Sequence, residues 1–129
     1  MLLECYRVLR PTGKIYLVLN HPAFRVPKAS AWGFDEAEMV QYRRVDRYLS
    51  ELPIKIDMHP GATEKTYTMS YHRPLQFYGK ALRKAGLAIT NIEEWISHRA
   101  SDSGPRAEAE NRARKEIPLF LFLEVGKVL

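Results

Sequence analysis

The chain has 129 residues, of which 46% are apolar and 27% are charged. This length and this balance are typical of one globular domain, residues 1–129, and exclude a disordered tail. The longest apolar runs, residues 15–19 and 119–123, are too short to span a membrane. A single cysteine, Cys5, excludes an internal disulfide and fits a reducing, cytoplasmic location.

The net charge of +5 comes from 20 lysines and arginines against 15 acidic residues. Such a charge can attract an anionic partner. The densest basic group is Arg43, Arg44 and Arg47, with Asp46 among them, and a run of mixed sign is typical of a solvated surface. The charge pattern therefore disfavours nucleic acid as a partner. A stand-alone basic α/β module that binds nucleic acid or a protein remains the alternative function.

The first elements are a helix and a buried strand. Helical spacing relates the apolar residues Leu2, Cys5, Tyr6 and Leu9, and the Pro-Thr-Gly sequence at 11–13 predicts a turn. Residues 15–19 form an apolar, β-favouring run without alternation. This pattern is typical of a strand in a parallel sheet that is covered on both faces.

Residues 20–70 form a long insertion that four prolines interrupt. Within it, residues 35–49 are compatible with a helix capped by Asp35. Alternatively, residues 41–49 pair with residues 65–71 as a β-hairpin. Small hydroxyl residues alternate with large ones along 65–71, which predicts a strand with one buried face.

The C-terminal part alternates helices and strands. A helix opens at Pro74, and Gly86 ends it; its apolar face consists of Leu75, Tyr78, Leu82 and Ala85. Residues 87–96 then predict a strand, 104–116 a polar helix, and 117–125 a second strand covered on both faces. Three main strands with only two amphipathic helices would leave apolar surface open. We therefore expect part of a larger doubly wound α/β sheet.

Three segments resemble class I S-adenosylmethionine-dependent methyltransferases. The sequence YRVLRPTGKIYLVLNHPAF, residues 6–24, resembles the helix, turn and fifth strand of that family. Residues 71–95, YHRPLQFYGKALRKAGLAITNIEEW, are similar to its next helix and sixth strand, and IPLFLFLEVGKV, residues 117–128, to its antiparallel seventh strand. The resemblance implies a Rossmann-like sheet in which strands 14–19 and 87–96 are parallel and strand 117–125 lies between them, antiparallel to both.

The chain departs from this family at the cofactor site. Its seven glycines never have the G-x-G-x-x-G spacing, and the acidic residue that follows the family's second strand has no counterpart. The resemblance therefore implies a C-terminal, substrate-side half. S-adenosylmethionine is the family's cofactor, but we expect that this chain alone neither binds it nor is active, and we assign no cofactor-binding residue.

The candidate site lies at the carboxyl ends of the parallel strands, where such sheets bind ligands. Residues 20–73 and 97–116 would form two lid segments over a small-molecule substrate. His21 is the candidate general base, because methyl transfer to oxygen or nitrogen is easier when the acceptor loses its proton; the alternative is a loop hydrogen bond. The candidate substrate-binding residues are Asn20, Tyr71, His72, Arg73, Arg43 and Arg44.

Simpler structural roles compete with these assignments. Residues 71–73 can cap and pack the following helix, and the arginines can lie on a solvated face. Trp32, Phe34 and Trp95 can line a pocket or belong to the core. The spacing of His21, Asp57, His59 and His72 matches no pattern of metal ligands, so we predict no metal site.

The proposed half-sheet would leave strand 14–19 with a free edge. Unpaired edges of this kind tend to pair with another chain. The helix at 2–9 would also expose apolar side chains. We therefore expect a homodimer or larger even oligomer whose interface uses residues 1–19.

Overall fold

The computed structural model describes residues 1–128. Three helices are present in this part of the chain: α1 (Leu2–Val8), α2 (Leu75–Lys84) and α3 (Ala107–Glu116). The strands are β1 (Lys14–Asn20), β2 (Ser30–Asp35), β3 (Val40–Val45), β4 (Leu52–Asp57), β5 (Tyr67–His72), β6 (Leu87–Trp95) and β7 (Phe120–Lys127). None of the described helices is long and apolar enough to cross a membrane.

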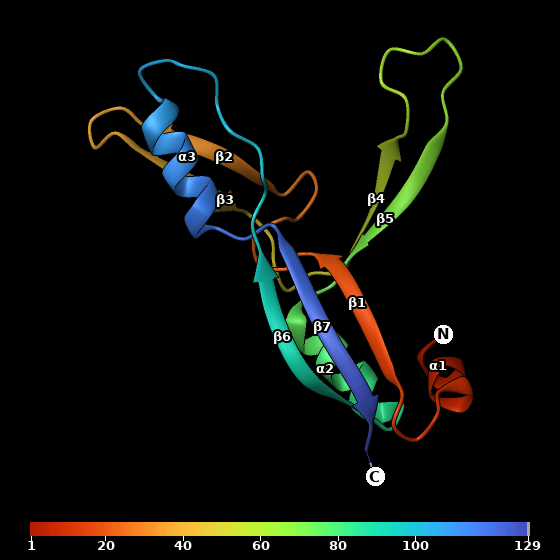
Figure 1. Cartoon of the computed structure of the whole chain (residues 1–129). Helices are drawn as coiled ribbons and strands as arrows, with labels where there is room; N and C mark the ends of the chain where they lie inside the picture. Colours follow the sequence, from red (N-terminus) through yellow and green to blue (C-terminus); the bar gives the residue numbers. More distant parts are fainter. Residues whose placement is uncertain (129) are drawn as a thin grey trace.

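The main sheet has three strands in the order β1-β7-β6. β7 is antiparallel to both neighbours, so β1 and β6 run in the same direction (Figure 1). Leu123 of β7 pairs with Leu17 of β1 on one side and with Ile92 of β6 on the other. The last strand thus takes the central position that the resemblance implies. The remaining strands form two separate hairpins.

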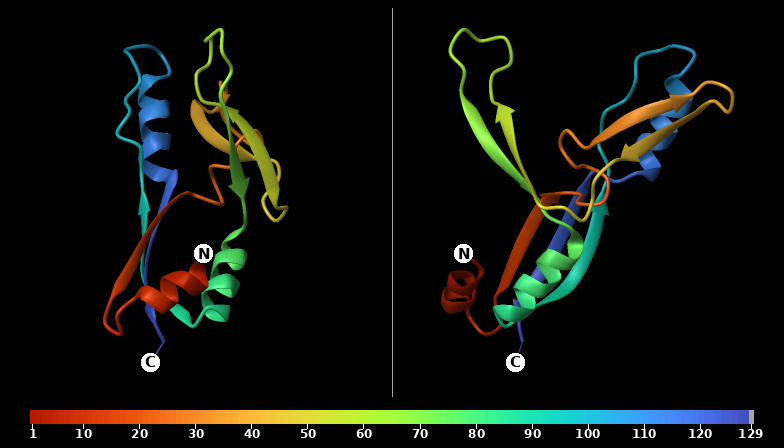
Figure 2. Two further views of the ribbon diagram at one scale, coloured as in Figure 1. Left: turned by 90° about the vertical axis from the view of Figure 1, so that its right-hand side faces the viewer. Right: turned by 180° about the vertical axis from the view of Figure 1, so that it is seen from behind.

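The core lies on one face of the main sheet. Helix α2 covers this face, and Leu82 packs there against buried residues that include Leu87 and Leu123 (Figure 2). On the opposite face, Tyr16 and Val18 are 62% and 55% exposed. The expectation that residues 15–19 are covered on both faces is therefore wrong for the described part of the chain. The strand is apolar on both sides, but only one side is buried.

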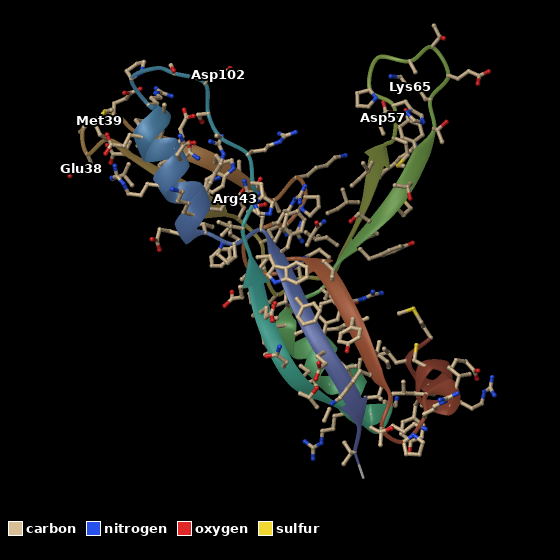
Figure 3. All side chains as sticks on the ribbon, in the orientation of Figure 1. Glu38, Met39, Arg43, Asp57, Lys65 and Asp102 are labelled. Carbon is tan, nitrogen blue, oxygen red and sulfur yellow. The ribbon has the colours of Figure 1, made fainter. Side chains whose placement is uncertain are left out.

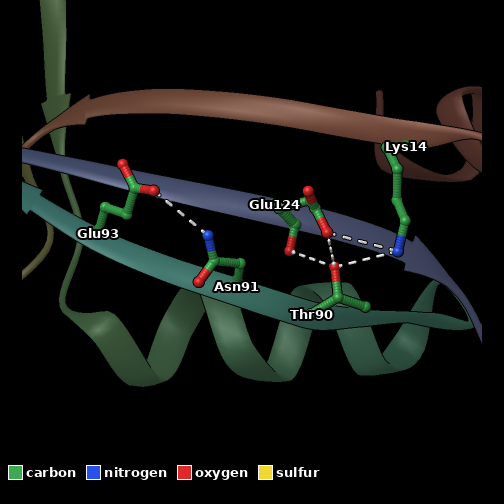
Figure 4. Close-up of polar contacts among 5 residues, drawn as sticks. All are labelled: Lys14, Thr90, Asn91, Glu93 and Glu124. Atoms are coloured by element: carbon green, nitrogen blue, oxygen red, sulfur yellow. Dashed lines mark hydrogen bonds and ion pairs between the residues drawn. The ribbon is translucent and has the colours of Figure 1, made fainter.

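A polar cluster crosses the uncovered face near the amino end of β1 (Figure 4). The Thr90 hydroxyl of β6 donates a hydrogen bond of 2.6 Å to the Glu124 carboxylate of β7, and Lys14 Nζ of β1 lies 3.5 Å from the same carboxylate. The hydrogen bond from Thr90, aided by Lys14, holds the pKa of Glu124 below its ordinary value. Side chains from all three strands therefore meet here.

The prediction of a helix between Pro74 and Gly86 is confirmed by α2. Pro74 precedes the first helical residue, and Gly86 follows the C-cap with a φ of +75°. A side chain at Gly86 would be strained by this left-handed conformation, and its Cβ would lie 3.1 Å from the Tyr6 ring of α1. The same glycine thus ends α2 and admits α1 beside it.

Residues 35–49 form neither of the two structures expected for them. They are not helical, and β3 pairs with β2 instead of with residues 65–71. The physical reason is that β2 and β3 are close in sequence, so the loop between them costs little entropy to close. Asp35 caps this loop, because its Oδ1 accepts the backbone N–H groups of Ala37 and Glu38 at 3.0 and 3.1 Å.

The strand expected at 65–71 is present as β5, and it pairs with β4. The prediction that it buries one face is wrong, because most of its residues are exposed. The physical reason is that this hairpin projects from the sheet, and so it has no layer to pack against (Figure 1). The other hairpin leaves the same end of the sheet and packs against α3.

Self-association through β1 is the first testable prediction. We expect the chain to form a homodimer or larger even oligomer, because β1 is an edge strand with an exposed apolar face. The variant Tyr16→Lys should shift the population to the monomer, since a lysine on an edge strand opposes pairing. Light scattering at micromolar concentration measures this shift.

The matched control is Tyr67→Lys, which changes an exposed tyrosine on the projecting hairpin. This variant should keep the oligomeric state of the wild-type chain. A stable wild-type monomer of 15.0 kDa would show that the expected interface does not form.

Candidate functional site

The candidate site lies where β1 and β6 end. The backbone N–H of His21, just after β1, donates to Leu119 C=O at 2.9 Å, and Leu119 N–H donates to Trp95 C=O at 3.2 Å. These bonds hold the ends of the two parallel strands level across the start of β7. Ligands of open α/β sheets bind beyond such carboxyl ends.

His21 is buried here and paired with an acid. Its side chain Nε2 lies 2.7 Å from Glu94 Oε2, and its Nδ1 accepts the backbone N–H of Ala23 at 3.2 Å. Because Nδ1 accepts a hydrogen bond from the Ala23 N–H, the ring proton of neutral His21 is on Nε2. This Nε2–H donates a hydrogen bond to Glu94. Both ring nitrogens are therefore occupied. The Glu94 side chain is 53% exposed, and so it is the accessible member of the pair.

Four of the six predicted substrate-binding residues line one cavity of about 340 Å³, here called the polar pocket. These are Asn20, Tyr71, His72 and Arg73, joined by residues that include Arg25 and Tyr78. Burial raises the pKa of the Tyr78 hydroxyl, although Arg73 opposes this shift. The structure thus brings together the ends of β1 and β5 with the first turns of α2.

His72 has a clear structural role in the wall of the polar pocket. Its Nε2 lies 2.6 Å from the Tyr48 carbonyl oxygen, to which only a protonated nitrogen can donate. The Tyr48 hydroxyl in turn accepts the backbone N–H of Leu75 at 3.1 Å, at the start of α2. The hydrogen bonds of Tyr48 to His72 and Leu75 therefore connect the segment after β3 to the first turn of α2, where backbone N–H groups lack helical partners.

Arg73 lies over two aromatic rings in the same wall. Its guanidinium carbon is 5.6 Å from the ring centre of Tyr71 and 4.7 Å from that of Phe77. Cation–π contacts of this kind position the group while leaving its N–H donors free. Arg73 can therefore orient a polar ligand.

A second cavity of about 620 Å³, the apolar pocket, lies beside the first. Its lining residues include Val18, Glu94, Trp95 and Phe120. Trp95 is stacked on Phe122 with ring centres 5.0 Å apart. Val18 lines both pockets, so they are adjacent at the end of β1.

Arg43 and Arg44 do not join the polar pocket. They alternate along β3, so their side chains lie on opposite faces of the hairpin. Arg44 is exposed and pairs with Asp46 at 2.8 Å. Arg43 lies beside α3 (Figure 3) and lines a third cavity of about 510 Å³, the arginine pocket, together with Arg25.

The other candidates lie apart from one another. Trp32 lines the arginine pocket and Trp95 the apolar pocket, whereas Phe34 lies under the Arg106 guanidinium. Within residues 1–128, no group of three histidine, cysteine or acidic side chains is placed to hold a metal. Sequence reasoning missed Glu94. The sequence did contain one indication of its role: Glu94 is an acidic residue near the end of β6, a strand predicted to be parallel to β1.

The second prediction concerns the His21–Glu94 pair. Glu94→Ala should lower the free energy of unfolding by about 1–3 kcal/mol, because it leaves a buried imidazole N–H without an acceptor. Urea denaturation measures the change. Glu93→Ala, at the neighbouring exposed position, is the control and should alter stability by about 0.5 kcal/mol or less. Equal effects of the two substitutions would contradict the assigned hydrogen bond.

Comparison with known proteins finds similarity at the level of structure. No family model and no curated protein matches the chain. A Mesorhizobium loti S-adenosylmethionine-dependent methyltransferase matches 96% of the chain with a TM-score of 0.66 and 27% identity. A Listeria monocytogenes protein assigned to the same class matches 99% with a TM-score of 0.66 and 23% identity, which shows the fold alone. The chain spans about half of each structure, 52% and 54% respectively.

Proposed function

We propose that this chain is the C-terminal, acceptor-binding half of an S-adenosylmethionine-dependent methyltransferase that acts on a small molecule. The observation that carries the proposal is the structural match of nearly the whole chain to about half of a methyltransferase at 27% identity. The location of the polar and apolar pockets supports it, since both lie at the carboxyl ends of parallel strands. In the intact enzyme, the half-sheet would continue beyond the free edge of β1 as a Rossmann-like sheet.

The residues present do not fit the cofactor. Close approach of backbone to S-adenosylmethionine needs a glycine-rich turn after a strand. Gly13 and Gly86 instead precede β1 and β6. Residues 21–29, between β1 and β2, contain no glycine, and residues 96–106, between β6 and α3, contain only Gly104. We therefore propose that the cofactor is held by residues outside this chain, and that the chain alone is inactive.

Acceptor binding would use the polar pocket. Arg73 and Asn20 would hold polar groups of the acceptor, and the aromatic walls would exclude water from its reacting atom. The two hairpins and α3, within residues 20–73 and 97–116, would act as lids. These segments leave the same end of the sheet (Figure 1), and residues from both ranges line the pockets.

The His21–Glu94 pair would handle the acceptor's proton. Methyl transfer to oxygen or nitrogen releases a proton, and a positioned base lowers the barrier. Glu94 lines the apolar pocket and is accessible, whereas His21 is buried behind it. We propose that the Glu94 carboxylate accepts the proton, while His21 orients this carboxylate by donating its Nε2–H to it.

The third prediction compares cofactor binding by two proteins. Residues 1–129 would replace the matching half of the M. loti methyltransferase to give a chimera. The chimera should bind S-adenosylmethionine saturably in calorimetry, because its other half supplies cofactor contacts. The isolated chain should show no saturable heat, because β1 and β6 are not followed by a glycine-rich turn.

Circular dichroism shows that both proteins are folded before the titrations. Micromolar binding by the isolated chain would refute the assignment of the cofactor site to residues outside it. A folded chimera that fails to bind would contradict the half-domain proposal itself.

A further inference from the structure

Four arginines converge on the arginine pocket from separate parts of the chain. Arg25 follows β1, Arg43 belongs to β3, Arg99 follows β6, and Arg114 belongs to α3. They line a cavity of about 510 Å³ that contains no acidic side chain in its wall. The fold therefore gathers four positive charges around one hollow.

Neighbouring groups position Arg43 without neutralising it. Its Nε donates to the Phe24 carbonyl at 2.8 Å, and its Nη2 donates to Ser30 Oγ at 3.1 Å. The guanidinium carbon lies 5.1 Å from the ring centre of Trp32. A guanidinium has five N–H donors, so three of them remain for a ligand. Desolvation by burial and the proximity of Arg25 lower the pKa of Arg43.

The other arginines are placed in a similar way. The Arg25 guanidinium carbon lies 5.1 Å from the ring centre of Phe120. Arg114 donates to Ser101 Oγ and Asn111 Oδ1, and Glu110 reaches it only through the Ser101 hydroxyl. The Arg99 side chain has no hydrogen-bond partner within residues 1–128. Donors are therefore available on every side of the cavity.

Ion pairing separates these arginines from others on the surface. Arg7, Arg44, Arg106 and Arg112 each form an ion pair with a carboxylate. Within residues 1–128, none of the four arginines of the pocket does so. Like charges held together in a partly buried site repel one another, and an anion relieves this repulsion. The pocket thus has the electrostatics of an anion-binding site.

We propose that the arginine pocket binds an oxyanion group, a phosphate or a carboxylate, of a small molecule. A guanidinium group can donate two parallel hydrogen bonds to two oxygens of a planar carboxylate or of a tetrahedral phosphate. The cavity volume of about 510 Å³ is in the range that holds a whole small molecule carrying such a group, whereas nucleic acid is bound along an extended groove. The first candidate for the molecule is the methyl acceptor, and this identification alone rests on the proposed function.

Shared walls connect the anion site to the other pockets. Arg25 lines the polar pocket as well, and Phe120 also lines the apolar pocket. A molecule whose oxyanion lies among the arginines can therefore extend toward the polar or the apolar pocket. The structure accordingly assigns an acidic small molecule as the substrate class.

Calorimetric titration with inorganic phosphate and with citrate tests the anion site on the wild-type chain. Saturable binding of either anion is expected, and the comparison of the two distinguishes a phosphate site from a carboxylate site. Arg99→Gln and Arg114→Gln should each weaken binding about tenfold, the loss expected for one charge-assisted hydrogen bond. Arg99→Gln removes no side-chain hydrogen bond or ion pair within the described residues, so the fold should be preserved.

Two control variants lie on the same elements but outside the pocket. Arg44→Gln on β3 and Arg112→Gln on α3 remove exposed arginines and should leave anion affinity unchanged. Absence of saturable binding by the wild-type chain at millimolar phosphate and citrate would overturn the proposal. Equal weakening by pocket and control variants would also overturn it, because the anion would then respond only to net charge.

A duplex oligonucleotide provides the remaining arm of the test. Tight duplex binding that weakens equally in pocket and control variants would replace the anion site by a nucleic-acid surface. Failure of the chimera to bind S-adenosylmethionine, together with pocket-dependent phosphate or citrate binding, would overturn the methyltransferase proposal and leave the anion site. If the chimera binds S-adenosylmethionine but no pocket-dependent phosphate or citrate binding is found, only the anion-site proposal is overturned.

Discussion

The pairing of β7 with both β1 and β6 is the constraint on which the rest of the structure depends. Because β7 is antiparallel to each neighbour, β1 and β6 must run in the same direction and end at the same edge. Leu121, Leu123 and Val125 then face α2 and form the core with Leu82. No described helix or hairpin covers the opposite face of the sheet (Figure 2), where Tyr16 and Val18 are exposed.

This geometry also creates the candidate site. Only parallel strands with level ends place Glu94 beside His21, two residues that are 73 positions apart in the sequence. The polar, apolar and arginine pockets meet around the end of β1 and the start of β7, since Val18, Phe120 and Arg25 each line two of them. One edge of the sheet therefore combines an acid–imidazole pair, apolar walls and unneutralised positive charge.

Features with local physical causes could be predicted from the sequence, and those that depend on distant pairing could not. Pro74 and Gly86 bound α2 as expected, since each restricts its own backbone. The grouping of Arg43 with Arg44 failed, because a strand sends neighbouring side chains to opposite faces. The resemblance predicted that the segments after β1 and before α2 meet at one edge of the sheet. The polar pocket agrees with this, because its lining includes Asn20, Tyr71, His72 and Arg73. Glu94 was missed because its role depends on pairing with His21, 73 positions away in the sequence.

Amide hydrogen exchange followed by NMR tests the central claim most directly, namely that β7 is internal and β1 is an open edge. In the Tyr16→Lys variant, which should be monomeric, amides throughout β7 should be protected because this strand has a partner on each side. Along β1, protection should alternate, since every second amide points away from β7. Uniform protection along β1, equal to that of β7, would contradict the account.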